Sequence, residues 1–323
     1  MQKRNHAIRL VSTKDMSREE WLAIRNQGIG SSDSAAVVGL SPYKSPLELW
    51  MEKTGRKPPD DLSDNEAVFW GSTLEPVIAQ VYGEKTGAKV RQVHAVLQHH
   101  EHPHMLANLD RIVAHPEDGH GLLEIKTAGL WSEAYWEDGV PEHYQCQVLH
   151  QLAVTGKPWA DVAVLIGGQE FRTYRIERDE EKINALIELE DQFWQHVLND
   201  TPPEVDGSES SGKALSMLYP SDNGEAVDFS DSEEMNALFK RLLLARQERE
   251  RVELEEATLK QQVQSAIGFT SNAIFASGKV GWKKVKGSTA TDFKQLAEAH
   301  PELVTQYTVQ KPGYRRFTVQ VGK

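Results

Sequence analysis

Residues 105–126 read MLANLDRIVAHPEDGHGLLEIK, and this stretch decides the fold of the chain. Two apolar runs, residues 105–113 and 121–125, flank a segment at 115–119 that is rich in turn-forming residues. Apolar runs bounded by such a segment are typical of strands joined by a tight turn. The stretch therefore predicts two adjacent antiparallel strands.

Three charged side chains on these strands indicate a catalytic site. Because side chains alternate along a strand, Glu124 and Lys126 share one face. If Asp110 lies on that face as well, the two carboxylates can bind one hard cation such as Mg²⁺, and Lys126 can orient or deprotonate a water. This is the chemistry of a nuclease. An exposed ion pair beside a hairpin gives the same local pattern, so further residues are needed to distinguish it from a catalytic site.

Two helical patterns supply further polar groups. Residues 69–82 repeat apolar side chains at intervals of three and four, and Glu75 projects from this otherwise packed helix. Residues 144–152 also read as a buried helix, yet they include three glutamines and a histidine. Buried amides need hydrogen-bond partners, which either a structural network or the wall of an active site provides. In the second case Gln147 faces the metal or the phosphate.

At this point the chain resembles the YqaJ-type viral recombinases, a branch of the PD-(D/E)XK nuclease superfamily that includes phage lambda exonuclease. The resemblance covers about residues 18–198. It depends on an ordered series of positions: Arg25 with Gly30-Ser31-Ser32-Asp33, Gly71 with Glu75, Leu109-Asp110, Leu123-Glu124-Ile125-Lys126, and Tyr144 with Gln147. The family often has Asp-Gly where this chain has Asp110-Arg111, so Arg111 is expected either in solvent or on the DNA backbone.

The resemblance implies a fold and a set of roles. The fold is α/β, with a restriction-endonuclease-like core in which helices flank a mixed central sheet. The implied ligands of Mg²⁺, for which Mn²⁺ can substitute, are Asp110, Glu124, Glu75 and the carbonyl oxygen of Ile125. Lys126 assists the attacking water, and Gln147 completes the site. The resemblance also implies that Arg25 and Ser32 bind a terminal 5′ phosphate.

The run Gly28-Ile29-Gly30-Ser31-Ser32-Asp33-Ser34 is compatible with a phosphate site on its own chemistry. Its glycines permit close backbone approach, and its Ser and Asp residues are N-cap types ahead of a helix expected at 35–40. Free N–H groups at a helix start attract phosphate. An ordinary capped helix is the simpler alternative, and Asp33 opposes an anion unless it caps the helix or meets Arg25. No GK[ST] sequence follows, which disfavours a nucleotide-binding P-loop.

Composition limits the class of protein. With 323 residues and 39% hydrophobic content, the chain can bury a full core and a second region. No run of eighteen apolar residues and no leader-like start is present, so we expect a cytosolic protein without a membrane span. The resemblance places it in a phage or prophage of a bacterial host. The single cysteine, Cys146, excludes an internal disulfide and any iron–sulfur site with four cysteines.

The net charge of −12 is unusual for a protein that binds DNA, but the charge is unevenly distributed. Residues 1–57 hold ten Lys and Arg against six Asp and Glu, and residues 273–323 hold nine against three. The segment between them therefore carries −22. The second basic end interleaves lysines and arginines with aromatics as single-strand binders do, and charged edges of a small sheet serving solubility are the equal alternative.

The sequence divides into four regions. Residues 1–199 are expected to form the nuclease core, which ends with strands at 160–167 and 169–177 and a helix at 180–198. Residues 200–232 read as a linker, and residues 233–268 as a long amphipathic helix. Residues 269–323 are expected to form a small basic α+β unit with a hairpin, a helix at 292–299 and a final strand at 314–321.

A histidine-rich loop at residues 94–104 offers side chains that can act as metal ligands. Five histidines lie in it: His94, His99, His100, His102 and His104. Their spacing is irregular, Pro103 interrupts them, and no cysteine is nearby. A polar loop is therefore the preferred interpretation over a structural zinc site.

The resemblance implies a Mg²⁺-dependent 5′-to-3′ exonuclease that acts on double-stranded DNA ends and leaves a 3′ single strand, and the acids, the lysine and the anion-site residues make this chemistry physically sensible. The resemblance implies a separate single-strand annealing protein as partner for recombination, and a homo-oligomer in the form of a trimeric ring. A structure- or sequence-specific endonuclease on the same fold is the alternative enzyme. A non-catalytic DNA-binding or scaffold protein is the alternative from another class, although such a protein has no need of clustered acids that repel phosphate.

Overall fold

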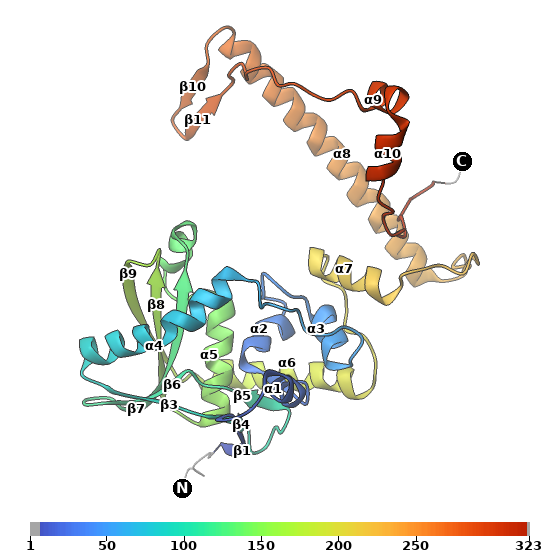
Figure 1. The fold of residues 1–323 in the computed structure, drawn as a ribbon. Helices are drawn as coiled ribbons and strands as arrows, with labels where there is room; N and C mark the ends of the chain where they lie inside the picture. The colour runs from blue at the N-terminus through green and yellow to red at the C-terminus, as the bar shows by residue number, and fades with distance from the viewer. Residues whose placement is uncertain (1–6, 322–323) are drawn as a thin grey trace. The chain divides into compact units, whose positions relative to one another are not determined.

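The computed structural model describes residues 7–321, in which the chain forms two compact units, Met1–Pro220 and Ser221–Lys323 (Figure 1). The first unit contains the candidate site. Its central sheet has five strands in the order β3-β6-β7-β8-β9. Their bounds are β3 Lys89–Gln92, β6 Arg111–His115, β7 Gly119–Ala128, β8 Trp159–Ile166 and β9 Glu170–Glu177. The β7–β8 pair is parallel and the others are antiparallel, so the predicted α/β class with a mixed central sheet is confirmed.

Alternation along β7 and β8 gives the central sheet two apolar faces. Leu122 packs with Val148 and Leu152 of helix α5 (Glu142–Thr155) in one buried cluster. Leu123 packs with Ile78 of helix α4 (Glu66–Thr86) in another. Adjacent residues of a strand point to opposite faces, so α5 and the second half of α4 cover opposite sides of the sheet. Glu124 and Lys126 share the face of Leu122, which is the face toward α5.

A second sheet of four strands, in the order β1-β4-β5-β2, adjoins α5 and carries the glycine-rich segment. Its bounds are β1 Ile8–Ser12, β2 Ile29–Gly30, β4 Ala95–Gln98 and β5 Met105–Ala107. The predicted strand at 105–113 is therefore two strands in different sheets, β5 and β6. The break falls at residues 108–110, where the chain leaves one sheet for the other, and Asp110 lies at this crossing.

Helices around α5 close the first unit. They are α1 Arg18–Arg25, η1 Ser31–Asp33, α2 Ser34–Val37, α3 Pro46–Lys53, η2 Leu130–Trp136, α6 Glu180–Leu198 and α7 Glu209–Leu218. The helix expected at 35–40 is the single turn α2. The segment predicted as a linker contains α7, whose Ala214 is buried with residues of α3 and α6. This compact unit reaches Pro220, beyond the expected end at residue 199.

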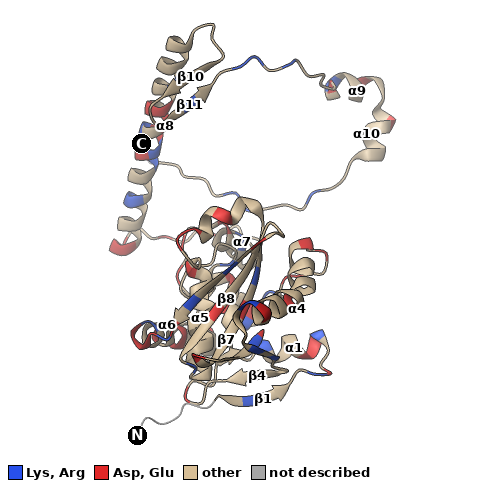
Figure 2. Cartoon of the chain, turned by 90° about the vertical axis from the view of Figure 1, so that its left-hand side faces the viewer, with Lys and Arg blue, Asp and Glu red and all other residues tan. Residues whose placement is uncertain are grey.

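The second unit consists of α8 Glu233–Ile267, the hairpin β10 Asn272–Phe275 and β11 Gly278–Gly281, and the short helices α9 Phe293–Ala299 and α10 Pro301–Tyr307. Acidic and basic side chains both occur along α8 (Figure 2), with pairs such as Arg251–Glu255 at 3.0 Å. Within the described part of this unit, Ile267 is the one buried hydrophobic residue. The strand expected at 314–321 is wrong: these residues have no regular secondary structure and are almost all exposed, since no neighbouring strand pairs with them.

Candidate active site

Glu124 lies at the centre of a hydrogen-bond network between β7 and α5. Its Oε1 accepts hydrogen bonds from Lys126 Nζ at 2.7 Å and from Gln147 Nε2 at 2.6 Å. Its Oε2 accepts one from Gln151 Nε2 at 2.7 Å. The side chain is nearly inaccessible to solvent, at 3% exposure. A carboxylate buried in this way is stabilised only because each oxygen has a donor.

Lys126 is fixed by three neighbours. Besides Glu124, its ammonium group donates to Gln147 Oε1 at 3.0 Å and lies 4.6 Å from the centre of the Tyr144 ring. Burial on its own lowers the pKa of Lys126, but the carboxylates of Glu124 and Asp110 offset this, and the pKa is raised overall. The side chain therefore carries its positive charge at neutral pH.

Asp110 joins this group from the crossing between the two sheets. Its Oδ2 accepts a hydrogen bond from the backbone N–H of Ile125 at 2.8 Å, which places it beside β7. Burial, followed by the negative charges of Glu124 and Glu75, raises the pKa of Asp110 to about 8. Lys126 and Arg111 together do not compensate the charge of three carboxylates in a buried space, and a cation would favour the ionised form of Asp110.

Arg111 differs from the expectation that it lies in solvent or on the DNA backbone. Its side chain is 8% exposed, and Nη1 donates to Glu75 Oε1 at 2.5 Å and to the carbonyl oxygen of Asp110 at 2.6 Å. A charge this deeply buried requires a partner, and Glu75 is that partner. The arginine thus occupies the turn where the family often has glycine, and it holds Glu75 next to Asp110.

A cavity of about 400 Å³ adjoins these residues. It is lined by the first half of α4, the end of β7 and α5, including Glu75, Asp110, Glu124, Lys126 and Gln147. The five residues predicted to be catalytic therefore all line one cavity. Their carboxylates do not form a closed cage: within the described chain, the two sets of three ligands that converge within 4.8 Å are His102, His104 and Asp191, and Glu48, Glu52 and Asp60.

The candidate phosphate site forms around Arg25, at the end of α1. Arg25 Nη2 donates to Ser32 Oγ at 2.6 Å and pairs with Asp33 Oδ1 at 2.6 Å. Lys53 Nζ pairs with the other oxygen of Asp33 at 2.8 Å. Burial would raise the pKa of Asp33, but Arg25 and Lys53 hold it well below its usual range. Two cations against one carboxylate leave a net positive charge, which resolves the expected conflict between Asp33 and an anion.

The positive charge at this point comes from these side chains and not from the start of a helix. The expected helix does start here, at Ser34, but α2 has only four residues, too few for a substantial dipole. A cavity of about 150 Å³ opens here, lined by Arg25, Ser32, Asp110 and Gln147 among others. Asp110 and Gln147 also line the larger cavity, so the two spaces adjoin.

Two contributors to the site were not singled out from the sequence. Gln151 carried a signal, because it follows Gln147 by one helical turn in a helix that is otherwise buried. Lys53 carried none, since it lies 20 residues from Asp33 on a separate helix.

Comparison with known proteins identifies the family. Residues 20–158 match the family described as the YqaJ-like viral recombinase domain. The chain is 33% identical over 316 residues to the uncharacterized protein YqaJ of Bacillus subtilis (strain 168), covering 96% of this chain and 97% of that protein. It therefore belongs to the YqaJ family. It is also 27% identical over 161 residues to the uncharacterized protein R354 of Acanthamoeba polyphaga mimivirus, covering 46% of this chain and 28% of that one.

Two solved structures are similar over part of the chain. One is an alkaline exonuclease, LHK-Exo, from Laribacter hongkongensis, with 26% identity, a TM-score of 0.48, and coverage of 56% of this chain and 93% of the other. The second is a phage-related exonuclease from Haemophilus somnus 129PT, with 12% identity, a TM-score of 0.39, and coverage of 56% and 99%. The TM-scores are below 0.5, so the family assignment depends on the sequence match. Among the described helices, none is both long and apolar enough to cross a membrane.

Proposed function

We propose that the protein is a Mg²⁺-dependent 5′-to-3′ exonuclease that acts on the ends of double-stranded DNA. The observation that carries this proposal is the junction of two cavities at Asp110 and Gln147. One cavity is lined by carboxylates and an ammonium group, and the other is lined by Arg25 and Ser32. An enzyme that removes nucleotides from a phosphorylated end needs an anion site beside its hydrolytic site.

The residues of the larger cavity fit a hard divalent cation. Asp110, Glu124, Glu75 and the carbonyl group of Ile125 offer oxygen ligands, the type that Mg²⁺ prefers and Mn²⁺ also accepts. The raised pKa of Asp110, caused by burial and by Glu124, supports a need for positive charge here. The chemistry that such a cation supplies is charge neutralisation at the scissile phosphate and at the attacking water. Glu75 stays oriented through Arg111.

Lys126 is suited to orient the attacking water. Its ammonium group stays protonated at neutral pH because the carboxylate of Glu124 offsets the effect of burial. It can therefore donate a hydrogen bond to the water and stabilise negative charge on the phosphate oxygens. Gln147 bonds to both Lys126 and Glu124, and so fixes the distance between the metal ligand and the ammonium group.

Arg25 and Ser32 set the proposed polarity. If they bind a terminal 5′ phosphate, the next phosphodiester bond lies toward Asp110 and the strand is removed from its 5′ end. The product is then a 3′ single strand, for which a strand-annealing protein is the expected partner. The name of the matched family supports a role in viral recombination, in a phage or prophage. A trimeric ring of this chain would keep the enzyme on its DNA.

The polarity is tested with linear duplex DNA labelled separately at its 5′ and 3′ ends, with closed circular DNA as control. We expect Mg²⁺-dependent loss of the 5′ label first, no cleavage of the circle, and faster digestion of 5′-phosphorylated ends than of hydroxyl ends. Arg25→Ala should remove most of that preference, since it removes the guanidinium that holds the phosphate. Cleavage of the circle would indicate an endonuclease, and early loss of the 3′ label would indicate the opposite polarity.

The catalytic roles are tested by single substitutions that preserve shape. Asp110→Asn, Glu124→Gln and Lys126→Met should each lower the cleavage rate by at least about 100-fold, as loss of one electrostatic stabiliser does. Lys44→Met is a matched control, because Lys44 pairs with Glu52 and lies outside both cavities that meet at Asp110. Folded variants with the rate of the native protein would exclude this site. Duplex binding without any cleavage by the native protein would indicate a DNA-binding role.

A further inference from the structure

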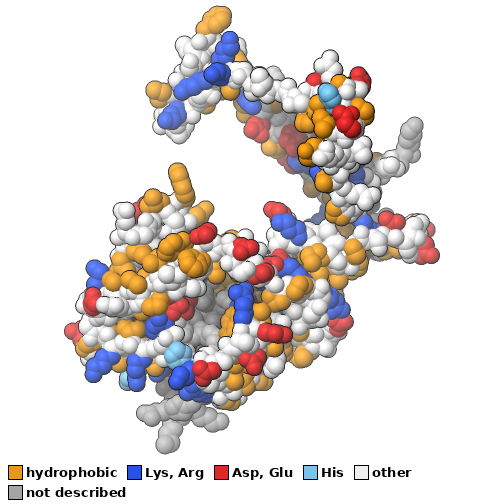
Figure 3. All heavy atoms as spheres, viewed as in Figure 1, with side chains coloured by type: hydrophobic (Ala, Val, Ile, Leu, Met, Phe, Trp, Pro, Cys, Tyr) orange, Lys and Arg blue, Asp and Glu red, His pale blue; other side chains and the backbone are white. Residues whose placement is uncertain are grey.

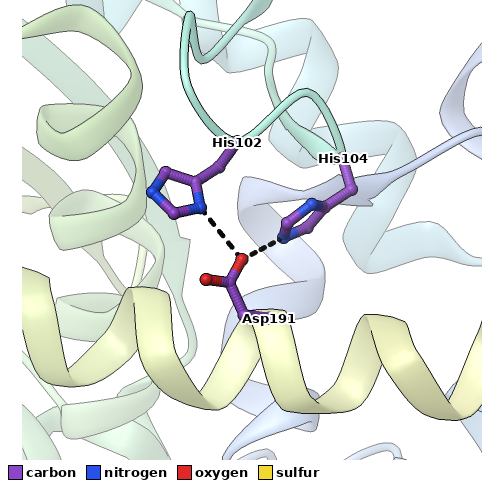
Figure 4. Close-up of side chains that lie close together, drawn as sticks. All are labelled: His102, His104 and Asp191. Atoms are coloured by element: carbon purple, nitrogen blue, oxygen red, sulfur yellow. Dashed lines mark hydrogen bonds and ion pairs between the residues drawn. The ribbon is translucent and has the colours of Figure 1, made fainter.

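We propose a second metal site, specific for a transition metal such as Zn²⁺, formed by His102, His104 and Asp191 (Figure 4). The two histidines lie in the loop between β4 and β5, and Asp191 lies on α6. The site goes beyond the proposed nuclease activity. The loop was expected to be simply polar because its histidines are irregularly spaced, Pro103 interrupts them and no cysteine is nearby. Asp191 is separated from His102 by 89 residues.

The three ligand atoms converge on one point. Asp191 Oδ1 lies 2.9 Å from His102 Nδ1 and 3.0 Å from His104 Nε2, and all three atoms lie within 4.8 Å of one another. Around a tetrahedral Zn²⁺, ligand atoms about 2.0–2.2 Å from the metal are separated by about 3.3–3.6 Å. Asp191 Oδ1 is therefore closer to each nitrogen by about 0.3–0.7 Å than in such a site, and the two nitrogens lie within 4.8 Å of each other.

His104 provides the observation that an ion pair alone leaves unexplained. Its Nε2 is buried and makes no hydrogen bond, although the carboxylate oxygen is 3.0 Å away. The short separation thus lacks the angles of a hydrogen bond, and a buried polar atom is left without a partner. An ion bound by both atoms satisfies the nitrogen and the oxygen together. The side chain of His102 already has a hydrogen-bond contact to Asp191.

The surroundings hold these ligands in place. His99 Nδ1 accepts hydrogen bonds from the backbone N–H groups of Glu101 at 3.2 Å and of His102 at 3.0 Å, which fixes the turn of the loop. The ring of His104 stacks on Trp194 at 5.7 Å and 11°. Trp194 is three residues after Asp191, so one face of α6 positions both a ligand and the support of another. Ordered support of this kind is typical of metal ligands.

The donor set selects the class of ion. Two imidazoles and one carboxylate suit Zn²⁺ and its neighbours, whereas Mg²⁺ prefers oxygen ligands only. Asp191 is 41% exposed and His102 is 28% exposed, so a fourth position is open to water. The other convergent set, Glu48, Glu52 and Asp60, does not compete as a candidate. Its carboxylates are already paired with Lys57, at 2.9, 3.2 and 2.6 Å.

A bound ion would connect the histidine loop, α6 and the glycine-rich segment. The carbonyl oxygen of His104 accepts a hydrogen bond from the N–H of Ile29 at 2.6 Å. A side chain at Gly28 would collide with that oxygen, so the two segments are in close backbone contact. Ile29 and Gly30 lead directly into η1. Fixing His104 to α6 therefore limits the movement of the segment that carries Ser32.

Metal binding is tested on the full chain after treatment with a chelator and desalting. Co²⁺ is added in the presence of millimolar Mg²⁺, which occupies oxygen-only sites, and Zn²⁺ is then used to displace it. We expect one equivalent of Co²⁺ with the intense visible absorption of a four-coordinate nitrogen-containing site. Zn²⁺ at about a hundredfold excess over its dissociation constant should raise the melting temperature by about 5–10 °C. Absence of stoichiometric binding would overturn the proposal.

Substitutions locate the ion. Asp191→Asn and His102→Gln should each weaken Zn²⁺ binding by at least about 100-fold, since loss of an outer partner alone costs up to that factor. His100→Gln is the matched control, because His100 lies in the same loop but outside the convergent set, and it should bind Zn²⁺ as the native protein does. Unchanged binding in Asp191→Asn and His102→Gln would overturn the proposal, as would loss of binding in the Asp110→Asn, Glu124→Gln double variant.

Discussion

At the scale of single residues, the candidate site depends on how completely Glu124 is bonded. Gln147 and Lys126 bind one carboxylate oxygen, while Gln151 alone binds the other. An oxygen without a donor in a buried space favours the protonated carboxyl group, which does not bind cations. If Glu124 is a metal ligand as proposed, Gln151 therefore affects how readily the cation is bound.

Gln151→Leu should raise the Mg²⁺ concentration for half-maximal cleavage by at least about tenfold, because one missing hydrogen bond to a buried charged group costs about 1.5–3 kcal/mol. Gln145→Leu is the control on the same helix, since Gln145 bonds to the carbonyl oxygen of Val140 and not to an acid. Cleavage rates across a Mg²⁺ titration provide the measurement. An unchanged titration in Gln151→Leu would show that Glu124 does not depend on this donor.

A second buried pair has a structural role in the core. His150 Nδ1 lies 2.8 Å from Glu190 Oε1, and its Nε2 lies 2.9 Å from the carbonyl oxygen of Leu106. Both ring nitrogens thus face acceptors, which suits the imidazolium form. Burial alone lowers the pKa of His150, but Glu190 and then Leu106 outweigh it, and the pKa is raised.

This pair predicts a pH dependence of stability. A group whose pKa is raised on folding contributes stability below its unfolded pKa, about 6.5 for histidine, and loses it as pH rises through the folded value. Glu190→Gln should cost about 3 kcal/mol in the free energy of unfolding at pH 6, and the difference from the native protein should shrink toward pH 9. Urea unfolding at several pH values measures this. A difference that grows with pH would contradict a charged His150.

At the scale of elements, the sequence predicts those helices and strands in which apolar residues repeat at a regular interval. The helix at 180–198 and the strands at 160–167 and 169–177 were anticipated within about a residue of α6, β8 and β9, because their apolar residues repeat regularly. Glu75 and Glu124 were singled out in a helix and a strand that fold as expected, α4 and β7, whereas Asp110 lies where the expected strand is broken. Asp191 and Lys53 were not singled out, since each acts with residues on a different element, and only the folded chain brings these together.

Helix α7 shows that amino-acid composition alone does not identify a linker. The predicted linker is rich in Pro, Gly, Ser and acidic residues, yet α7 buries Ala214 against α3 and is capped by Ser208. Ser210 Oγ also accepts a hydrogen bond from the backbone N–H of Ser45 at 2.8 Å. A long-range contact of this kind outweighs a weak local preference for a turn.

A chain ending at Pro220 should therefore unfold at a higher urea concentration than a chain ending at Asn199. We expect a difference of about 3 kcal/mol in unfolding free energy, from the exposed apolar area and the lost hydrogen bond. Tryptophan fluorescence reports the transition, because Trp50 lies in the same cluster as Ala214. Ala214→Asp in the longer chain should reproduce most of the loss. Equal midpoints for both chains would restore the expected boundary at residue 199.

At the scale of the whole molecule, regions of the chain differ in net charge, and the total of −12 does not show this difference. The acids of α8 are offset locally by pairs such as Arg251–Glu248 at 2.7 Å, so this helix presents little net field. Beyond it, residues 273–323 hold nine Lys and Arg against three Asp and Glu. Basic side chains gather near the β10–β11 hairpin (Figure 3), close in sequence to the exposed rings of Phe275 and Trp282.

If this basic segment binds DNA, removing it should change the salt dependence of binding. A chain ending at residue 272 should bind linear duplex DNA more weakly at low salt. Each lost phosphate contact lowers the slope of log affinity against log salt by about 0.9 for duplex DNA, or about 0.7 for a single strand. Three or four contacts therefore reduce the slope by about three, which fluorescence anisotropy between 50 and 200 mM salt resolves.

The control replaces Lys283, Lys284 and Lys286 by Gln in the full chain, which removes charge but keeps the segment. It should lower the slope by up to about 2.7, and less for each lysine that does not reach a phosphate. Substituting Trp282 by Ala should weaken binding to a single strand more than to a duplex, because a base can stack on the indole only when it is unpaired. If the truncated chain keeps the native slope and changes its oligomeric state, the segment mediates assembly and its lysines do not contact DNA.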